Sequence, residues 1–150
     1  MRESEHFVFF RDLVLPYLYK IVKDNDLRIW SAGCSSGEEP YTLAMIINDF
    51  FREEKMWWDT QILATDISRK VLGKAIKGVY TNDAIKTLPP TWKQNYFKKI
   101  GNDISEISDI IKKEVIIRKF NLMESLFPFK RKFHIIFCRN VMIYLMTRQE

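Results

Sequence analysis

Apolar positions along the chain follow two patterns: helical spacing near the start and short unbroken runs further on. At helical spacing lie Phe10, Leu13, Leu15, Leu18, Ile21 and Val22. This spacing predicts a helix over Phe9–Val22. Pro16 lies inside the pattern and lacks the N–H that a helix interior needs, so we expect a kink or a restart of the helix there.

Four short apolar runs have the length and composition of strands that are buried on both faces. They are Leu27–Ser31, Thr60–Thr65, Val115–Phe120 and Phe133–Cys138. Between and after them we predict helices over Glu39–Glu53, Arg69–Lys77, Thr91–Lys99 and Val141–Met146, and a polar connection over Gly101–Asp109. Strands that alternate with helices indicate an α/β fold, in which right-handed crossovers join the strands of a parallel sheet.

The stretch Ile29–Tyr41, I-W-S-A-G-C-S-S-G-E-E-P-Y, leads from an apolar run through small residues into a helix. Gly33 and Gly37 allow positive φ and a close approach of the backbone to a ligand. Pro40 suits the first turn of a helix, where its missing N–H is not needed. In α/β sheets, a turn of this kind at the carboxyl end of the first strand is a place where nucleotides bind.

Two carboxylates, Glu38 and Glu39, stand beside this turn. A phosphate site would not favour them, because the N-terminus of a helix attracts anions. They suit a ligand with hydroxyls or with positive charge. S-adenosylmethionine has both, since a cationic sulfonium joins its ribose to its amino acid part. The alternative is that the two residues only complement the helix dipole.

Polar residues also follow the other predicted strands. Asp66 ends the second strand, about 30 residues beyond the turn, whereas the spacing in dinucleotide folds is roughly 20 residues. An acidic residue at this position is placed to accept hydrogen bonds from ribose hydroxyls. The alternative is that Asp66 or Ser68 caps the helix Arg69–Lys77. The third and fourth strands lead into Asn121-Leu122 and Arg139-Asn140, so we expect four strand ends to converge on one ligand site.

Composition excludes several classes of protein. The chain has 150 residues, of which 47% are hydrophobic, so it can bury the core of one domain. Lys and Arg exceed Asp and Glu by 24 to 19, a net charge of +5. The densest basic run, Lys130-Arg131-Lys132, is typical of a solvated turn rather than a nucleic-acid patch. We therefore expect no nucleic-acid partner.

Cysteine and histidine are too few and too scattered for a metal centre or a disulfide scaffold. Cys34 and Cys138 each lie at a predicted junction of strand and loop, and His6 and His134 have no metal-like spacing. No apolar run reaches the length of a membrane span, and the N-terminus has no signal-like apolar region. These features favour a cytoplasmic location, with no membrane insertion.

Three stretches resemble the chemotaxis receptor methyltransferase (CheR) family. They are the turn S-A-G-C-S-S-G-E-E-P-Y, the sequence F-F-R-D at Phe9–Asp12, and F-C-R-N-V-M-I-Y at Phe137–Tyr144. Three long matches in the family's order are far more specific than a lone glycine motif. The resemblance covers essentially the whole chain, but not the whole length of a family protein.

The resemblance implies a Rossmann-like class I methyltransferase sheet with parallel strands flanked by helices. It also implies methyl transfer from S-adenosyl-L-methionine to glutamate side chains of methyl-accepting chemotaxis receptors, in their cytoplasmic helical domain, with S-adenosyl-L-homocysteine as product. Carried over residue by residue, the family's catalytic residues match Arg11 and Tyr144. Its cofactor contacts match Glu39, Asp66, Asn121, Leu122, Arg139 and Asn140.

The implied chemistry suits these residue types. A substrate carboxylate attacks the methyl group in line, so the enzyme mostly has to position two reactants. Arg11 would hold the carboxylate through charge-assisted hydrogen bonds. Tyr144 would line the path of the methyl group.

The chain also departs from the family pattern. Glu5 and Phe7 stand where the family usually has the Asn and Thr of an N-x-T motif. We do not expect the family's helical N-terminal domain in residues 1–150, and the family's sheet continues after the tyrosine with a helix, more strands and a small β-subdomain. We therefore expect residues 1–150 to form a partial methyltransferase domain that lacks the C-terminal strands of the sheet. The alternatives are a truncated, inactive remnant that binds cofactor or receptor, and a methyltransferase for small molecules or RNA, which the F-C-R-N-V-M-I-Y match disfavours.

Overall fold

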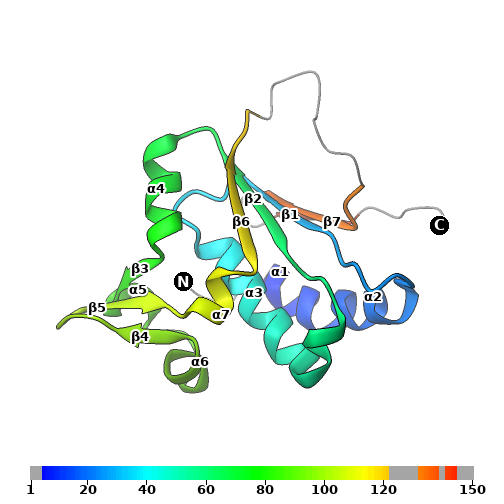
Figure 1. Cartoon of the computed structure of the whole chain (residues 1–150), viewed down its shortest axis with the longest axis horizontal. Helices are drawn as coiled ribbons and strands as arrows, with labels where there is room; N and C mark the ends of the chain where they lie inside the picture. The colour runs from blue at the N-terminus through cyan, green and yellow to red at the C-terminus, as the bar shows by residue number, and fades with distance from the viewer. Residues whose placement is uncertain (1–4, 122–131, 139–140, 145–150) are drawn as a thin grey trace.

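The computed structural model describes residues 5–121, 132–138 and 141–144, and its centre is a five-stranded sheet (Figure 1). The strand order is β6-β2-β1-β7-β8. The strands are β1 Ile29–Ala32, β2 Ile62–Asp66, β6 Val115–Lys119, β7 Ile135–Cys138 and β8 Val141–Tyr144. β1, β2, β6 and β7 run parallel, as predicted, and each predicted strand is found within two residues of its expected start.

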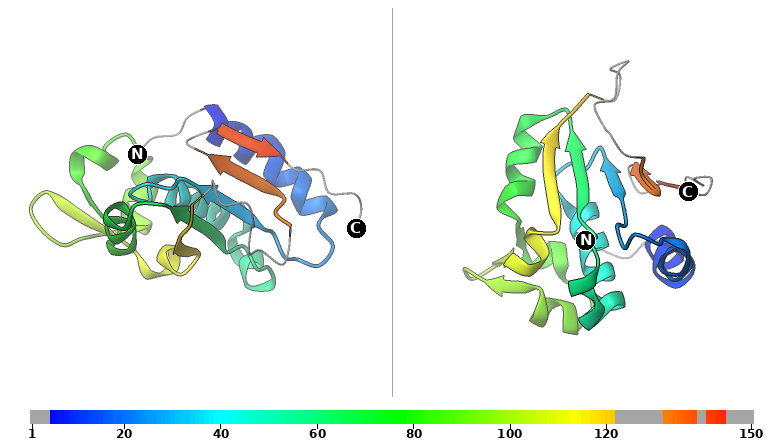
Figure 2. Two further views of the ribbon diagram at one scale, coloured as in Figure 1. Left: turned by 90° about the horizontal axis from the view of Figure 1, so that it is seen from above. Right: turned by 45° about the vertical axis from the view of Figure 1, so that its right-hand side comes forward.

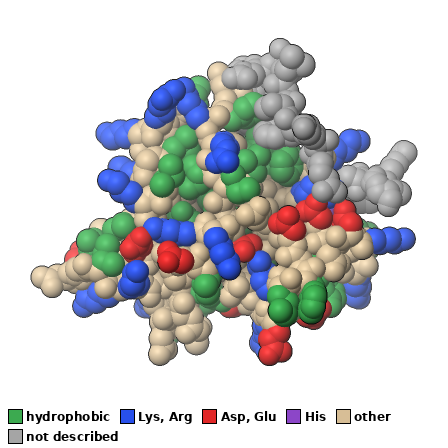
Figure 3. Space-filling view, viewed as in Figure 1, with side chains coloured by type: hydrophobic (Ala, Val, Ile, Leu, Met, Phe, Trp, Pro, Cys, Tyr) green, Lys and Arg blue, Asp and Glu red, His purple; other side chains and the backbone are tan. Residues whose placement is uncertain are grey.

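Burial explains why these runs form the centre of the sheet. Ile29 of β1 lies between Ile62 of β2 and Ile135 of β7, and all three side chains are fully buried. In the next row, Leu63 and Ile136 on either side of Trp30 are only partly buried. One face of the sheet therefore carries the main core, while apolar side chains remain visible on the face toward the viewer in Figure 3.

The N-terminal segment is helical with an interruption at the predicted proline. It comprises α1 Glu5–Phe9, a π-helical turn η1 Phe10–Val14, and α2 Leu15–Ile21. Pro16 lies in the first turn of α2, where its missing N–H costs nothing, and the widened π turn directly precedes it. This confirms the predicted restart. Phe7 and Phe10 place their rings on Phe137 of β7 and so attach the segment to the sheet.

The long helix after the glycine turn, α3 Glu38–Phe51, runs through the core and continues into the 3-10 turn η2 Arg52–Trp57. Most of its residues are buried, and it packs against β2, β6 and η1. The helix α4 occupies Arg69–Lys77, the predicted range, and packs against β2 and β6. Two views of the ribbon show these helices beside the parallel strands (Figure 2).

A second, three-stranded antiparallel sheet corrects the prediction for residues 79–107. Its order is β3-β5-β4, formed by β3 Val79–Thr81, β4 Phe97–Lys99 and β5 Ile104–Ile107. Short helices α5 Asn82–Ile85 and α6 Pro90–Asn95 lie between β3 and β4, and α7 Asp109–Lys112 follows β5. The predicted helix Thr91–Lys99 ends at Asn95, and the predicted polar connection Gly101–Asp109 contains a strand.

The predicted helix over Val141–Met146 is also wrong for the residues that the structure describes. Val141–Tyr144 forms β8, which pairs antiparallel with β7. The sequence V-M-I-Y is β-branched and aromatic, and such residues fit a pleated sheet. Pairing also satisfies the backbone groups along the edge of β7, which a helix at this position would leave open.

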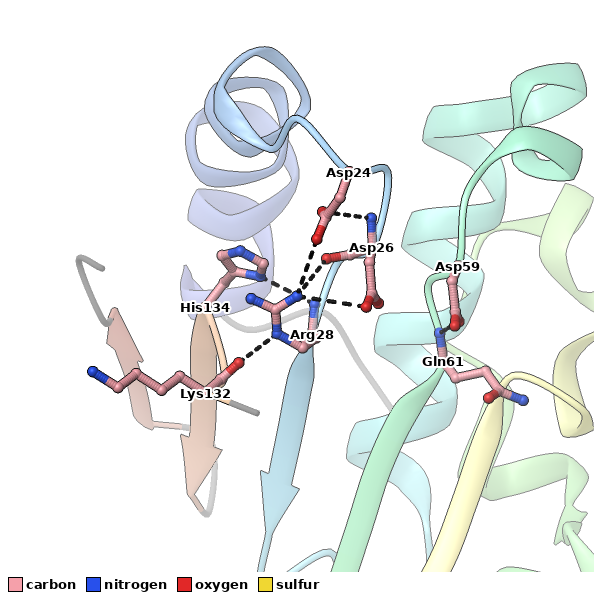
Figure 4. A network of polar contacts seen from close by, with 7 residues as sticks. All are labelled: Asp24, Asp26, Arg28, Asp59, Gln61, Lys132 and His134. Atoms are coloured by element: carbon pink, nitrogen blue, oxygen red, sulfur yellow. Dashed lines mark hydrogen bonds and ion pairs between the residues drawn. The ribbon is translucent and has the colours of Figure 1, made fainter. Parts of the chain in front are cut away.

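A polar network holds β1 and β7 together at their amino ends (Figure 4). The backbone N–H of Arg28 donates to Nδ1 of His134 (3.1 Å), and the N–H of His134 donates to the carbonyl of Arg28 (2.9 Å). The Arg28 guanidinium lies 3.8 Å from Asp24 and 3.5 Å from Asp26. This end of the sheet is therefore fixed by structural contacts, which leaves the carboxyl ends for a ligand.

Candidate functional site

The glycine turn is held in a conformation that few residues adopt. Gly33, Ser35 and Gly37 all have positive φ, at 71°, 52° and 98°. The N–H of Cys34 donates to the carbonyl of Thr65 (2.8 Å), and the N–H of Ser35 donates to Oδ2 of Asp66 (2.9 Å). The turn that follows β1 is thus fixed to the end of β2.

Asp66 therefore has a structural role in the turn, besides the capping role that the sequence left open. Its Oδ1 accepts from the N–H of Ser68 (3.1 Å). The helix cap itself is Ser68, whose hydroxyl accepts from the N–H of Val71 (3.4 Å). A carboxylate has about four acceptor sites, so two backbone bonds leave Asp66 able to accept from further hydroxyls at the strand end.

Glu39 is a buried carboxylate in the first turn of α3. Its side chain accepts from the hydroxyl of Ser31 in β1 (2.7 Å), and the residue is only 8% exposed. Glu38, beside it, accepts from the hydroxyl of Ser36. The two carboxylates thus differ: Glu39 faces the strand below the turn, and Glu38 pairs within the turn itself.

Two tyrosines pack against Gly37 and fix the turn from the other side. The hydroxyl of Tyr80 donates to the carbonyl of Ser36 (2.7 Å), and the hydroxyl of Tyr41 donates to the carbonyl of Ala75 (2.6 Å). A Cβ on Gly37 would lie 3.0 Å from both Tyr41 Cε2 and Tyr80 Oη. Only glycine fits this position, and through Tyr80 the small antiparallel sheet supports the site.

Burial near the turn suppresses ionisation of one thiol and two phenol side chains. It raises the pKa of the Cys34 thiol to about 12, with the charge of Asp66 adding to the effect. Burial likewise raises the pKa of Tyr41 to about 12 and that of Tyr80 well above its usual range. Cys34 is therefore a neutral thiol at physiological pH, and it is not activated as a nucleophile.

Aromatic side chains from three segments meet beside the strand ends. The indole N–H of Trp30 donates to the hydroxyl of Thr65 (2.9 Å), and its ring lies 5.9 Å from Phe120 and 5.5 Å from Phe133. The N–H of Phe120 donates to the carbonyl of Asp66 (3.0 Å). Asn121, the next residue, is thus brought close to Asp66, as predicted.

Two other predicted site residues, Arg11 and Tyr144, are described by the structure but are not part of this cluster. Arg11 lies in η1, 2.8 Å from Asp12 in an ion pair. It lines a cavity of about 300 Å³ with Ile46 and Phe50 of α3 and Trp92 of α6, two turns or more from Glu39 along the helix. Tyr144 lies at the end of β8, not on a helix. Leu122, Arg139 and Asn140 lie outside the described residues.

Sequence reasoning also missed residues that shape the site. Trp30, Ser31, Ser35 and Tyr80 are ordinary strand or loop residues in the sequence, and only their contacts show their roles. Ser35 gave no signal, because serine has no preference for the positive φ that it adopts here. Tyr80 gave none either.

The sequence matches a known protein family, and this match agrees with the geometry of the turn. The model of the family described as "CheR methyltransferase, SAM binding domain" matches residues 1–150. The chain belongs to the CheR methyltransferase family. The match includes the glycine turn, Asp66 and every strand of the parallel sheet.

Relatives of CheR type extend beyond the length of this chain. A chemotaxis protein methyltransferase of Borreliella burgdorferi is 46% identical over 146 residues, which are 95% of this chain and 52% of the relative. A probable chemotaxis protein methyltransferase of Rhizobium etli is 38% identical over 95% of this chain and 54% of its own length. The chain thus spans about half the length of these relatives. Among solved structures, the methyltransferase domain of bacterial CtHen1 covers 85% of this chain and 47% of its own, at 16% identity and a TM-score of 0.39.

Metal-binding clusters and membrane-spanning helices are both absent from the described residues. No group of three or more His, Cys, Asp or Glu residues in residues 5–121, 132–138 and 141–144 is arranged to hold a metal ion. In the same residues, no helix combines the length and apolar character needed to cross a bilayer.

Proposed function

We propose that this chain is the cofactor-binding catalytic domain of a chemotaxis methyltransferase. It would transfer a methyl group from S-adenosyl-L-methionine to glutamate side chains in the cytoplasmic helical domain of a chemoreceptor and release S-adenosyl-L-homocysteine. The observation that carries the proposal is the joined turn: Ser35 and Asp66 hold the ends of β1 and β2 together beside Asn121. The similarity of the chain to chemotaxis methyltransferases supports the substrate class.

The residues present fit this cofactor chemically. Asp66 keeps acceptor capacity for ribose hydroxyls, and Glu38 and Glu39 place negative charge where a cationic ligand would lie. The aromatic group of Trp30 and Phe120 offers an apolar surface next to the same strand end. The cofactor would supply an electrophilic methyl group on a sulfonium, and the chain's own task is to bind, orient and exclude water.

The catalytic roles of Arg11 and Tyr144 remain part of this proposal. Arg11 would orient the substrate carboxylate, since a guanidinium presents a planar pair of donors. In the structure that guanidinium is engaged by Asp12 and lies beside α6, so it would have to leave Asp12 to reach a substrate at the turn. Leu122, Arg139 and Asn140 would complete the cofactor contacts.

The position of Arg11 also favours a second candidate, a remnant that binds cofactor or receptor without turnover. One experiment separates the two. The chain is incubated with methyl-labelled S-adenosylmethionine and receptor-bearing membranes, and the label is tested for release by mild base, which cleaves methyl esters. Base-labile label on the receptor supports the methyltransferase, and bound cofactor without transferred label supports the remnant. Label on RNA or on a small molecule would contradict both.

A further inference from the structure

The outer edge of β6 borders a groove that the proposed function does not use. Among residues 5–121, 132–138 and 141–144, β6 is the last strand on its side of the sheet. The N–H of Ile62 donates to the carbonyl of Glu114, and the N–H of Phe120 donates to the carbonyl of Asp66. With this register, the alternation of a strand directs the backbone groups of Val115, Ile117 and Lys119 away from β2. The groove along this edge encloses about 380 Å³, and its walls are Tyr41, Ile76, Lys112 and residues 115–118.

The groove is apolar inside and basic around its rim. Ile76 of α4 is 60% exposed beside Ile116 and Ile117. The segments 69–77 and 109–119, which frame the groove, contain eight Lys or Arg and only two acidic residues, a net charge of +6. The whole chain carries +5, so the rest of it is net −1. Basic side chains are visible along the α4 side of the molecule in Figure 3.

Most of these cations have no ion-pair partner within the described residues. Within the described residues, Lys112 is the one member of the eight with an ion-pair partner, Glu106. Arg118 donates through Nη1 to the carbonyl of Ile117, its own neighbour on the outer edge (2.8 Å). Basic side chains on an edge strand also discourage association with other strands. That role alone does not explain the apolar groove or the lysines on α4.

We propose that this groove binds an extended, acidic segment of a protein partner, which adds as a strand to β6. The outward backbone groups of Ile117 and its neighbours would form the hydrogen bonds, and Ile76 with Ile116 would receive an apolar side chain. The rim would attract the acidic side chains that flank it. Nucleic acid fits less well, because an apolar groove beside an open strand edge provides no stacking platform.

The test uses the 150-residue chain and a short blocked peptide of alternating valine and glutamate. Fluorescence anisotropy should show binding that weakens as salt rises. Ile76→Glu should weaken it by about tenfold or more and Arg118→Ala by about threefold, since each removes one part of the groove. The matched controls Ile100→Glu and Lys20→Ala lie on β4's flank and on α2, away from the groove, and should bind as the parent does. Circular dichroism confirms that each variant is folded.

A second measurement reads the backbone directly. On peptide binding, the amides of Val115, Ile117 and Lys119 should gain protection from hydrogen exchange, whereas those of Ile116 and Arg118, already bonded to β2, should change little. The proposal is overturned if the peptide does not bind, if all four variants bind equally, or if the protected amides lie in β3, β4 or β5. Binding of oligothymidylate in preference to the acidic peptide would also overturn it. These outcomes do not depend on cofactor binding at the glycine turn, so failure here leaves the proposed methyltransferase function intact.

Discussion

Asp66 illustrates how one side chain serves both the fold and a ligand. Its carboxylate joins the glycine turn to β2 and accepts from the N–H of Ser68. The sequence indicated an acidic residue at a strand end and left a capping role open. The structure assigns the cap to Ser68, so substitutions at the two positions can separate the roles.

Asp66→Ala should weaken S-adenosylmethionine binding by roughly 1.5–3 kcal/mol, the scale of hydrogen bonds to a charged acceptor. Ser68→Ala is the matched control, because it removes the cap at a cost of about 1 kcal/mol in stability and leaves the ligand position unchanged. Calorimetric titration of both variants measures the difference. Equal affinities in the Asp66→Ala variant and the parent would contradict the ribose role.

Arg11 and Tyr144 carry the prediction about catalysis. Arg11→Lys should fail to restore turnover, because an ammonium lacks the planar fork that holds a carboxylate. Tyr144→Phe should lower kcat by more than it lowers cofactor affinity, since it changes the lining of the methyl path and not the cofactor contacts. Steady-state kinetics with receptor as substrate tests both. Near-normal turnover in two folded variants would falsify the catalytic assignment.

Two glycines offer a comparison of strain at the residue scale. Gly37→Ala should destabilise the chain by about 1–3 kcal/mol, because φ is 98° and the new Cβ would press on Tyr41 and Tyr80. Gly73→Ala, in the middle of α4 with nothing within 4 Å of its Cβ, should stabilise it by about 0.5–1 kcal/mol. Urea unfolding of the two variants should shift the midpoint in opposite directions. If both midpoints shift in the same direction, helix or turn propensity does not explain the effects of the two substitutions.

At the scale of elements, burial decided which predictions succeeded. The parallel strands were predictable because their apolar runs are buried on one face and largely or partly buried on the other. α4 was predictable from its cap and its terminal glycine, Gly78. β4 and β5 are three or four residues long and mix polar with apolar side chains, so no period emerges from them. For β8 the sequence suits either structure, and pairing with β7 decides.

In the site, contacts between residues close to strand ends were predictable, whereas contacts between distant segments were not. The glycine turn, Asp66 and Asn121 follow strands directly, so their meeting at one edge could be predicted from the order of elements. Tyr80 reaches the carbonyl of Ser36 from another sheet, 44 residues away in sequence. No local pattern encodes such a contact. Arg11, expected to hold the substrate carboxylate, lines a cavity together with side chains of α3 and α6, and no local pattern predicted these neighbours.

The turn and its supporting tyrosines predict a loss of stability in alkali. The pKa of Cys34 is about 12 in the folded chain, and it falls to its ordinary value on unfolding. Since the folded state disfavours the thiolate, this contribution is complete below about pH 9 and is lost as pH rises toward 12. The free energy of unfolding should fall by about 1 kcal/mol between pH 8 and 10 from Cys34 alone. Urea titrations of Cys34→Ala should show a smaller fall, due to Tyr41 and Tyr80; an unchanged slope would contradict the assignment.

At the scale of the whole molecule, the exposed apolar surface is the feature that needs an explanation. Phe9, Leu13, Tyr17 and Ile21 recur every fourth residue along the N-terminal helical segment, and each is exposed. A separate apolar area lies on the sheet face opposite to that of Phe137, where the side chains of Leu63 and Ile136 are partly exposed. Monomeric proteins rarely leave large contiguous apolar areas open to water.

We therefore expect the 150-residue chain to self-associate or to be only marginally stable. The exposed helical stripe should contribute to association, because pairing would remove its apolar area from water. Leu13→Glu, at a position 59% exposed, should lower the weight-average mass in sedimentation velocity without lowering the melting temperature. Ile110→Glu, at a position 48% exposed on α7, is the control and should leave association unchanged. If the parent chain sediments as a monomer and melts sharply, this prediction is wrong. The chain would then be a compact minimal domain that tolerates these apolar side chains in water.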